Sequence, residues 1–100
     1  MSYYSVLAVT PSDTAWIEGY LPAANALVAK HGGTYLARTP NHERLEGAGE
    51  AALRIIIHWP SKAAAEAFMT DPDYAPHLAA RAAGSESHHY LIEGKDTLAP

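Results

Sequence analysis

The segment Ala52–Trp59 (ALRIIIHW) carries the strongest strand signal of the chain and decides its fold. Successive side chains of a strand point to opposite faces, so Ile55 and Ile57 lie on one face and Ile56 lies on the other. The segment Tyr3–Thr10 (YYSVLAVT) is a second strand with apolar residues on both faces. Strands of this kind are usually covered on both faces. The sheet that contains them therefore needs two covers.

The other elements are predicted from caps and breakers along the chain. Ser12 or Asp13 caps a helix that ends at Gly32-Gly33, and Pro22 inside this helix predicts a kink or a break. The elements after it are predicted in this order: a strand at 34–38 that resumes at 44–46, the strand at 52–59, a helix at 63–69 capped by Ser61, a helix from Asp71-Pro72 to about Ala83, and a strand at 87–93.

This order predicts one α+β domain over residues 1–94, with a four-stranded sheet and its helices on one face. Residues 95–100 form a C-terminal tail that is too short and too polar to cover the second face. We therefore expect a homodimer whose two sheets face each other in an eight-stranded, barrel-like core with room for one small ligand. The alternative is that the tail folds over the sheet.

Composition excludes several classes of protein. Seven Lys and Arg residues against eleven Asp and Glu give a net charge of −4 without a basic stripe, which argues against nucleic-acid and membrane partners. The absence of cysteine excludes disulfides, thiolate nucleophiles and Cys-ligated metals. No secretory signal is visible, and the longest apolar run, Ile55-Ile56-Ile57, cannot span a bilayer, so we expect a cytoplasmic protein.

A set of short motifs occurs in a fixed order over nearly the whole chain: Gly32-Gly33-x-Tyr35-x-x-Arg38, Leu45-Glu46-Gly47, Trp59-Pro60-Ser61, Asp71-Pro72-Asp73-Tyr74 followed by Arg81, and Glu93-Gly94. Together they resemble the bacterial family called domain of unknown function 1330. The resemblance implies a ferredoxin-like βαββαβ sandwich with a four-stranded antiparallel sheet, paired as a dimeric α/β barrel. The resemblance places the family in the dimeric α/β-barrel superfamily. Relatives there include cofactor-free monooxygenases, muconolactone isomerases and haem-binding enzymes, so the resemblance implies no single activity.

The chain departs from the family pattern at two positions. His58 precedes Trp59 where the family usually has an acidic residue, and Asp71 stands where the family often has Ser. If the acidic group serves chemistry elsewhere in the family, this protein either lacks that chemistry or performs it with an imidazole.

The histidines are the first candidates for chemistry. If the first and third strands are central and parallel, His58 lies at the same sheet edge as His88 and His89, with the backbones roughly 10 Å apart. Two imidazoles on one face would bracket a small molecule or a metal, and we select His58 for proton transfer and His88 for ligand binding. No third metal ligand is evident, so no metal site is assigned. The alternative is that these histidines only make structural hydrogen bonds.

Two arginines and two tyrosines complete the candidate site. Arg38 and Arg81 are suited to holding a carboxylate, and the phenols of Tyr20 and Tyr74 can donate to a carbonyl or a developing oxyanion. The alternatives are structural: the arginines form ion pairs, for instance with Glu46, Asp71 or Glu93, and the tyrosines pack at the edge of the core.

The sequence therefore supports three functional hypotheses. The first is a homodimer that binds a small acidic or aromatic molecule and could act on it as an enzyme of monooxygenase or isomerase type that needs no organic cofactor. The second is a non-catalytic ligand-sensing or structural interaction module. The third is haem or metal binding through the histidines. Neither a substrate nor a reaction follows from the residues alone.

Overall fold

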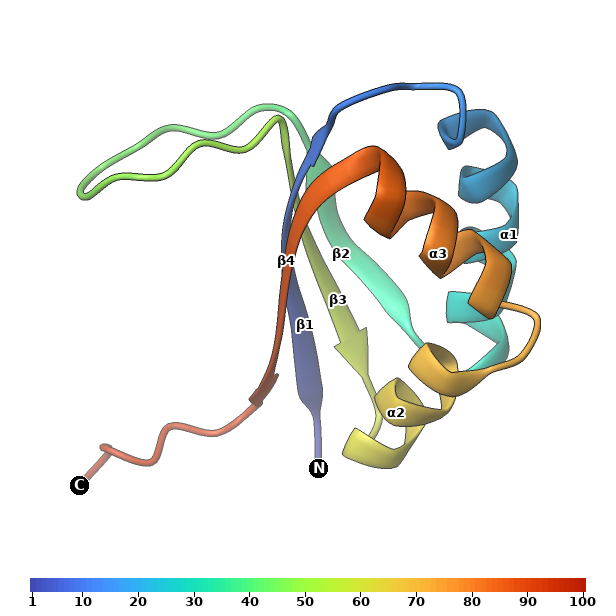
Figure 1. Ribbon diagram of the computed structural model, residues 1–100. Coiled ribbons are helices and arrows are strands. Elements are labelled where there is room, and N and C mark those ends of the chain that lie inside the picture. The colour runs from blue at the N-terminus through green and yellow to red at the C-terminus, as the bar shows by residue number, and fades with distance from the viewer.

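Four strands form one antiparallel sheet in the order β2–β3–β1–β4, and three helices lie on one of its faces (Figure 1). The computed structural model describes residues 1–100. The elements are β1 (Tyr3–Pro11), α1 (Ile17–Lys30), β2 (Thr34–Thr39), β3 (Leu53–Trp59), α2 (Lys62–Thr70), α3 (Ala75–Gly84) and β4 (Ser85–Glu93). The predicted four-stranded antiparallel α+β sandwich is confirmed.

Strand direction corrects one premise of the histidine prediction. β1 is antiparallel to both of its neighbours, with Tyr3 opposite Trp59 on β3 and opposite Glu93 on β4. The crossover through α1 makes β2 parallel to β1, and the β2–β3 connection reverses the chain again. The first and third strands therefore cannot be parallel, and the ends of β3 and β4 lie at the same edge.

Two helices differ from their predicted form. α1 begins at Ile17 rather than next to the predicted cap, because Asp13 instead accepts a hydrogen bond from the backbone N–H of Ala15 at 3.1 Å. The helix continues through Pro22 without a break, and Glu18, whose carbonyl the proline cannot satisfy, is exposed to water. The last helix begins at Ala75, since the preceding residues 71–74 form a turn.

The β2–β3 connection is a loop rather than a continued strand. β2 ends at Thr39 after a bulge between Tyr35 and Ala37, and the strand expected at residues 44–46 is absent. Within the loop, Arg44 donates to the carbonyl of Gly49 at 3.1 Å and forms an ion pair with Glu50. The loop is therefore held mainly by its own contacts, and its last residue is joined to the sheet by the backbone N–H of Ala52, which donates to Thr10 Oγ1 at 3.2 Å.

A hydrophobic core lies between the sheet and the helices. Its aromatic part is a row in which the ring centroids of Trp59 and Phe68 are 5.2 Å apart and those of Phe68 and Tyr74 are 4.2 Å apart. Gly33 lies so close that an added Cβ would stand 2.7 Å from the indole of Trp59. The second glycine of the predicted helix stop thus also serves close packing.

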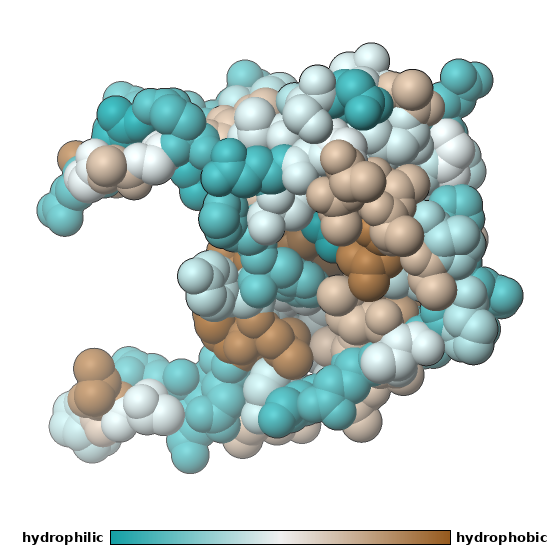
Figure 2. All heavy atoms as spheres, in the orientation of Figure 1, coloured by the Kyte–Doolittle hydropathy of each residue, from teal (hydrophilic) through white to brown (hydrophobic).

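The opposite face of the sheet carries no helix. Val6, Ile56, Tyr90 and Ile92 point to this open face and are 38%, 39%, 69% and 49% exposed. The loop over residues 40–52 and the tail over residues 94–100 both project toward this side (Figure 1). Figure 2 shows hydrophobic side chains in the hollow between the two projections. The tail extends away from the sheet instead of covering it.

The helices also bear on the membrane prediction. None of them combines the length and the apolar character that crossing a bilayer requires.

Candidate functional site

A cavity of about 90 Å³ lies between the helices and the covered face of the sheet. One water needs about 10–15 Å³ measured in this way, so the space suits a single small ring or a short chain. Twelve of its sixteen lining residues are hydrophobic, and the wall as a whole comes from all four strands, all three helices and the residues that precede α1 and α3. The few polar groups in this wall are therefore the ones that decide what can bind.

Arg81 is the most unusual of these polar groups. It projects from α3, is only 5% exposed, and has Nε and Nη1 buried without any hydrogen-bond partner. The centre of the Tyr20 ring lies 5.9 Å from the guanidinium carbon. The ion pair considered from the sequence, with Glu46, Asp71 or Glu93, is not formed.

Tyr20 and Tyr74 meet in the same cavity from α1 and from the turn before α3. Their hydroxyl oxygens are 2.6 Å apart, so one phenol donates to the other and the second keeps its own proton free to donate. Burial, followed by the neighbouring Tyr74, raises the pKa of Tyr20 far above its ordinary value. Tyr20 therefore stays a neutral phenol at physiological pH, and the pair has one hydroxyl proton left for a ligand.

Arg38 occupies a different position from Arg81. Its guanidinium carbon lies 3.8 Å above the centre of the Tyr35 ring, and its Nη1 donates to Oδ1 of Asn25 at 2.6 Å. Arg38 is exposed, while Tyr35 is half-buried and has a pKa raised mainly by that burial. Arg38 thus stands at the mouth of the cavity with its charge in contact with water.

The structure separates the two histidines that were selected from the sequence. His58 and His88 do share a face, but it is the open face, and His58 lies opposite Tyr4 while His88 lies opposite Ala8. Four residues of β1 correspond to about 13 Å, so the expected common edge is wrong. His58 Nε2 is 2.9 Å from Ser2 Oγ, and His88 contacts Glu86 at 3.3 Å.

His89, rather than His88, lines the cavity. Its Nε2 is 2.8 Å from Ser5 Oγ, which also accepts a hydrogen bond from the indole N–H of Trp59 at 2.8 Å. Burial, and then the positive charge of Arg81, lowers the pKa of His89. His89 has the parity of Leu91, which packs against the core, so the two side chains share the covered face of β4.

Trp16 was also missed as a site residue. Its indole N–H lies 2.9 Å from the carbonyl of Asp13 and 3.0 Å from that of Gly84, and its ring lines the cavity. An added Cβ at Gly84 would lie 2.3 Å from the indole Cδ1. Gly84, the last residue of α3, therefore makes room for a wall of the cavity.

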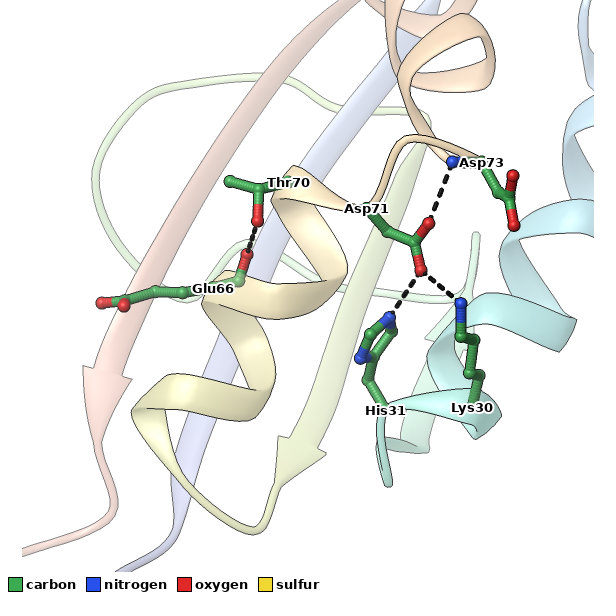
Figure 3. A network of polar contacts seen from close by, with 6 residues as sticks. All are labelled: Lys30, His31, Glu66, Thr70, Asp71 and Asp73. Atoms are coloured by element: carbon green, nitrogen blue, oxygen red, sulfur yellow. Dashed lines mark hydrogen bonds and ion pairs between the residues drawn. The ribbon is translucent and has the colours of Figure 1, made fainter.

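A second buried charge lies outside the cavity (Figure 3). Asp71 is 7% exposed, and its Oδ2 accepts hydrogen bonds from Lys30 Nζ at 2.9 Å and His31 Nε2 at 2.8 Å. Its Oδ1 accepts from the backbone N–H of Asp73 at 2.9 Å. These bonds, led by those from Lys30 and His31, hold the pKa of Asp71 far below its ordinary value. The cluster joins the end of α1 to the turn between α2 and α3.

Metal binding was one of the hypotheses from the sequence. No three His, Asp or Glu residues are grouped as they would have to be to hold a metal ion.

Comparison with known proteins agrees with this architecture. The model of a family described as Domain of unknown function (DUF1330) matches residues 2–95. A search of curated proteins finds no match.

Solved structures with the same fold come from several bacteria. A protein of unknown function from Rhodopseudomonas palustris has a TM-score of 0.81 at 16% identity, covering 95% of this chain and 83% of that one. A dimeric ferredoxin-like protein of unknown function from Jannaschia sp. CCS1 has a TM-score of 0.75 at 15% identity, covering 93% and 99%. The N63A mutant of SnoaB, a cofactor-independent oxygenase from Streptomyces nogalater, has a TM-score of 0.67 at 24% identity, covering 97% and 96%. These likenesses show a ferredoxin-like fold.

Proposed function

Because this chain belongs to the family described as Domain of unknown function (DUF1330), whose description names no activity, we propose its function from the site. The protein binds a small, largely apolar molecule that carries an acidic group, and Arg81 holds that group inside the cavity. It does so as a homodimer joined through the open face of the sheet.

The unpartnered guanidinium of Arg81 is the observation that carries the proposal. A buried charge costs free energy unless it is paired and hydrogen-bonded, and two nitrogens of Arg81 have no partner in the protein. A carboxylate accepts charge-assisted hydrogen bonds from a guanidinium, and these are stronger than hydrogen bonds between neutral groups. Such a ligand supplies the missing partner.

The rest of the wall defines the other properties of the ligand. The hydrophobic lining favours an apolar body, and the Tyr20–Tyr74 pair offers one further donor within the same cavity. No carboxylate lines this cavity, so it offers a cation no ion-pair partner. A compact aromatic or unsaturated acid combines the required features.

The open face supports pairing with a second copy. Four exposed apolar side chains form a patch on this face of the sheet. A domain of this size buries a limited share of its surface, so covering the patch would add to its stability. The loop over residues 40–52 and the tail project on the same side, where each would reach along a partner sheet. A protein of similar fold, from Jannaschia sp. CCS1, is described as dimeric.

Turnover without a cofactor is the second candidate function. It is supported by the hydrogen-bonded pair of phenols in the cavity and by a fold like that of SnoaB, described as a cofactor-independent oxygenase. His58, selected from the sequence for proton transfer, lies on the open face and would act only at the interface of a pair. Oxygen consumption or product formation with a bound acid separates turnover from a sensing role.

A thermal-shift comparison tests the binding proposal. We expect benzoate to raise the melting temperature of the wild type and benzamide to leave it unchanged, since a ligand at 100-fold its Kd adds about 2.7 kcal/mol. Arg81→Met should abolish the benzoate shift, and Arg44→Met, at an arginine of the exposed loop, should retain it. A benzoate shift of equal size in Arg81→Met would refute the anchor.

Sedimentation tests the pairing proposal. We expect a particle of twice 10.7 kDa at micromolar concentration, and Ile56→Glu on the open face should convert it to the monomer. A wild type that sediments at 10.7 kDa would contradict the homodimer.

A further inference from the structure

The hydrogen bonds around Ser5 single out one more residue of the cavity. Ser5 lies on β1, is 1% exposed, and has an Oγ that contacts both Trp59 Nε1 and His89 Nε2 at 2.8 Å. An indole N–H only donates, so Ser5 must be the acceptor in the first contact. Ser5 then still has its own hydroxyl proton to place.

His89 Nε2 is the one acceptor that this proton finds. Ser5 Oγ makes no other side-chain contact, and a buried hydroxyl proton without an acceptor is unfavourable. The Ser5 hydroxyl therefore donates to Nε2, which requires Nε2 to be unprotonated. In the neutral imidazole the proton is then on Nδ1, and no protein atom accepts a hydrogen bond from it.

We propose that Trp59 and Ser5 are positioning residues that fix His89 in its Nδ1–H form, and that His89 is a specificity residue that donates to a second oxygen of the ligand held by Arg81. The ligand class is thereby narrowed to acids with a neighbouring hydroxyl or carbonyl oxygen, such as 2-hydroxy or 2-oxo acids on a small apolar body. This inference rests on the proposed function.

Charge supports the same assignment. Both Arg81 and His89 line the cavity, and burial together with the Arg81 charge keeps the pKa of His89 below its ordinary value. The groups around it that carry or could carry charge are Arg81 on α3, the phenols of Tyr20 and Tyr74, and Glu66 on α2, which lines a second hollow with Ser5 and His89. The effects of burial and of the Arg81 charge nevertheless prevail and lower the pKa of His89, which favours the neutral imidazole as the form presented to the ligand.

Nuclear magnetic resonance tests the positioning step without any ligand. The ¹⁵N and ¹³Cδ2 shifts of His89 distinguish the two neutral tautomers and the imidazolium. At pH 7 we expect the Nδ1–H form in the wild type and a shift toward the Nε2–H form in Ser5→Ala. An Nε2–H tautomer or an imidazolium in the wild type would overturn the inference, and the wild-type measurement decides this even if Ser5→Ala fails to fold.

Binding of two probe acids tests the specificity step. We expect 2-hydroxybenzoate to bind the wild type about tenfold more tightly than benzoate, and His89→Phe to lose that preference while keeping benzoate binding. His89→Asn, which can place an amide N–H near the position of Nδ1, should retain part of it. A preference that survives in His89→Phe, or that His88→Phe removes instead, overturns the role of His89.

The two proposals fail in different ways. If neither acid binds the wild type, or if binding ignores Arg81→Met, the proposed function itself is wrong and the specificity step falls with it. If both acids bind through Arg81 and His89→Phe changes nothing, only the present inference is wrong.

Discussion

Asp71 and Arg81 are buried to nearly the same extent, at 7% and 5% exposure, but their surroundings are opposite. Asp71 has partners for both carboxylate oxygens, from Lys30, His31 and the backbone of Asp73 (Figure 3). Arg81 has two nitrogens with none. The first charge is part of what holds the helices together. The second is left without a partner by the fold, and this is the reason for proposing that Arg81 binds a ligand.

The largest loss of stability is expected when Asp71, the buried charge that has partners, is removed. Asp71→Ala leaves Lys30 and His31 without their acceptor and detaches the end of α1 from the α2–α3 turn, so we expect the largest fall in melting temperature among the proposed substitutions. Differential scanning calorimetry measures it. A melting temperature equal to that of the wild type would show that the cluster contributes no stability.

The reverse outcome is expected at Arg81. Arg81→Met replaces an unpaired buried charge with an apolar side chain of similar length, so the free energy of unfolding should rise by about 1–3 kcal/mol in the absence of ligand. Urea denaturation measures this, with the m-value as a check on the folded state. A loss of more than about 1 kcal/mol would mean that Arg81 already has a structural partner.

Acid unfolding sharpens the contrast further. The pKa of Asp71 is lower in the folded protein than in the unfolded chain, where it is about 3.9. The contribution of Asp71 to the free energy of unfolding is therefore complete above about pH 3.9 and is lost as the pH falls below that value. Stability of the wild type should therefore decline below about pH 4. Asp71→Asn should show a weaker decline over the same range, and an unchanged slope would contradict the assignment.

The smallest change in stability is expected when the hydrogen bond between Tyr20 and Tyr74 is removed. Tyr20→Phe removes one hydroxyl from the Tyr20–Tyr74 contact, and the net loss for one such hydrogen bond is about 1 kcal/mol. Guanidinium denaturation measures it, and Tyr4→Phe, at a tyrosine on the open face, is the matched control. A loss of several kcal/mol would place the pair among the structural networks instead.

Much of the fold could be predicted from local signals. Ala52–Trp59 defined the central strand, and its two apolar faces indicated one helical cover and one open face, as the structure has them. The prediction failed where tertiary contacts decide: the strand expected at residues 44–46 has no neighbour to pair with, and strand direction depends on the crossover rather than on any residue.

The site was predicted in part for the same reason. One cavity is lined by four of the residues selected from the sequence: Tyr20, Arg38, Tyr74 and Arg81. The correct selection of His89 rather than His88 required the register of β4 against β1. Two adjacent histidines in a sequence do not show that register. Alternation defines which residues share a face, but not which face the helices cover.

The sheet is a single layer, so adjacent residues of one strand serve different surfaces. Leu7 and His89 border the cavity, while Val6 and His88 border the open face. A ligand that shifts β1 or β4 from within moves the outer face with it. By thermodynamic reciprocity, any factor by which the ligand strengthens association of two copies equals the factor by which association strengthens ligand affinity. The concentration of the protein is then itself a variable in every titration of the cavity.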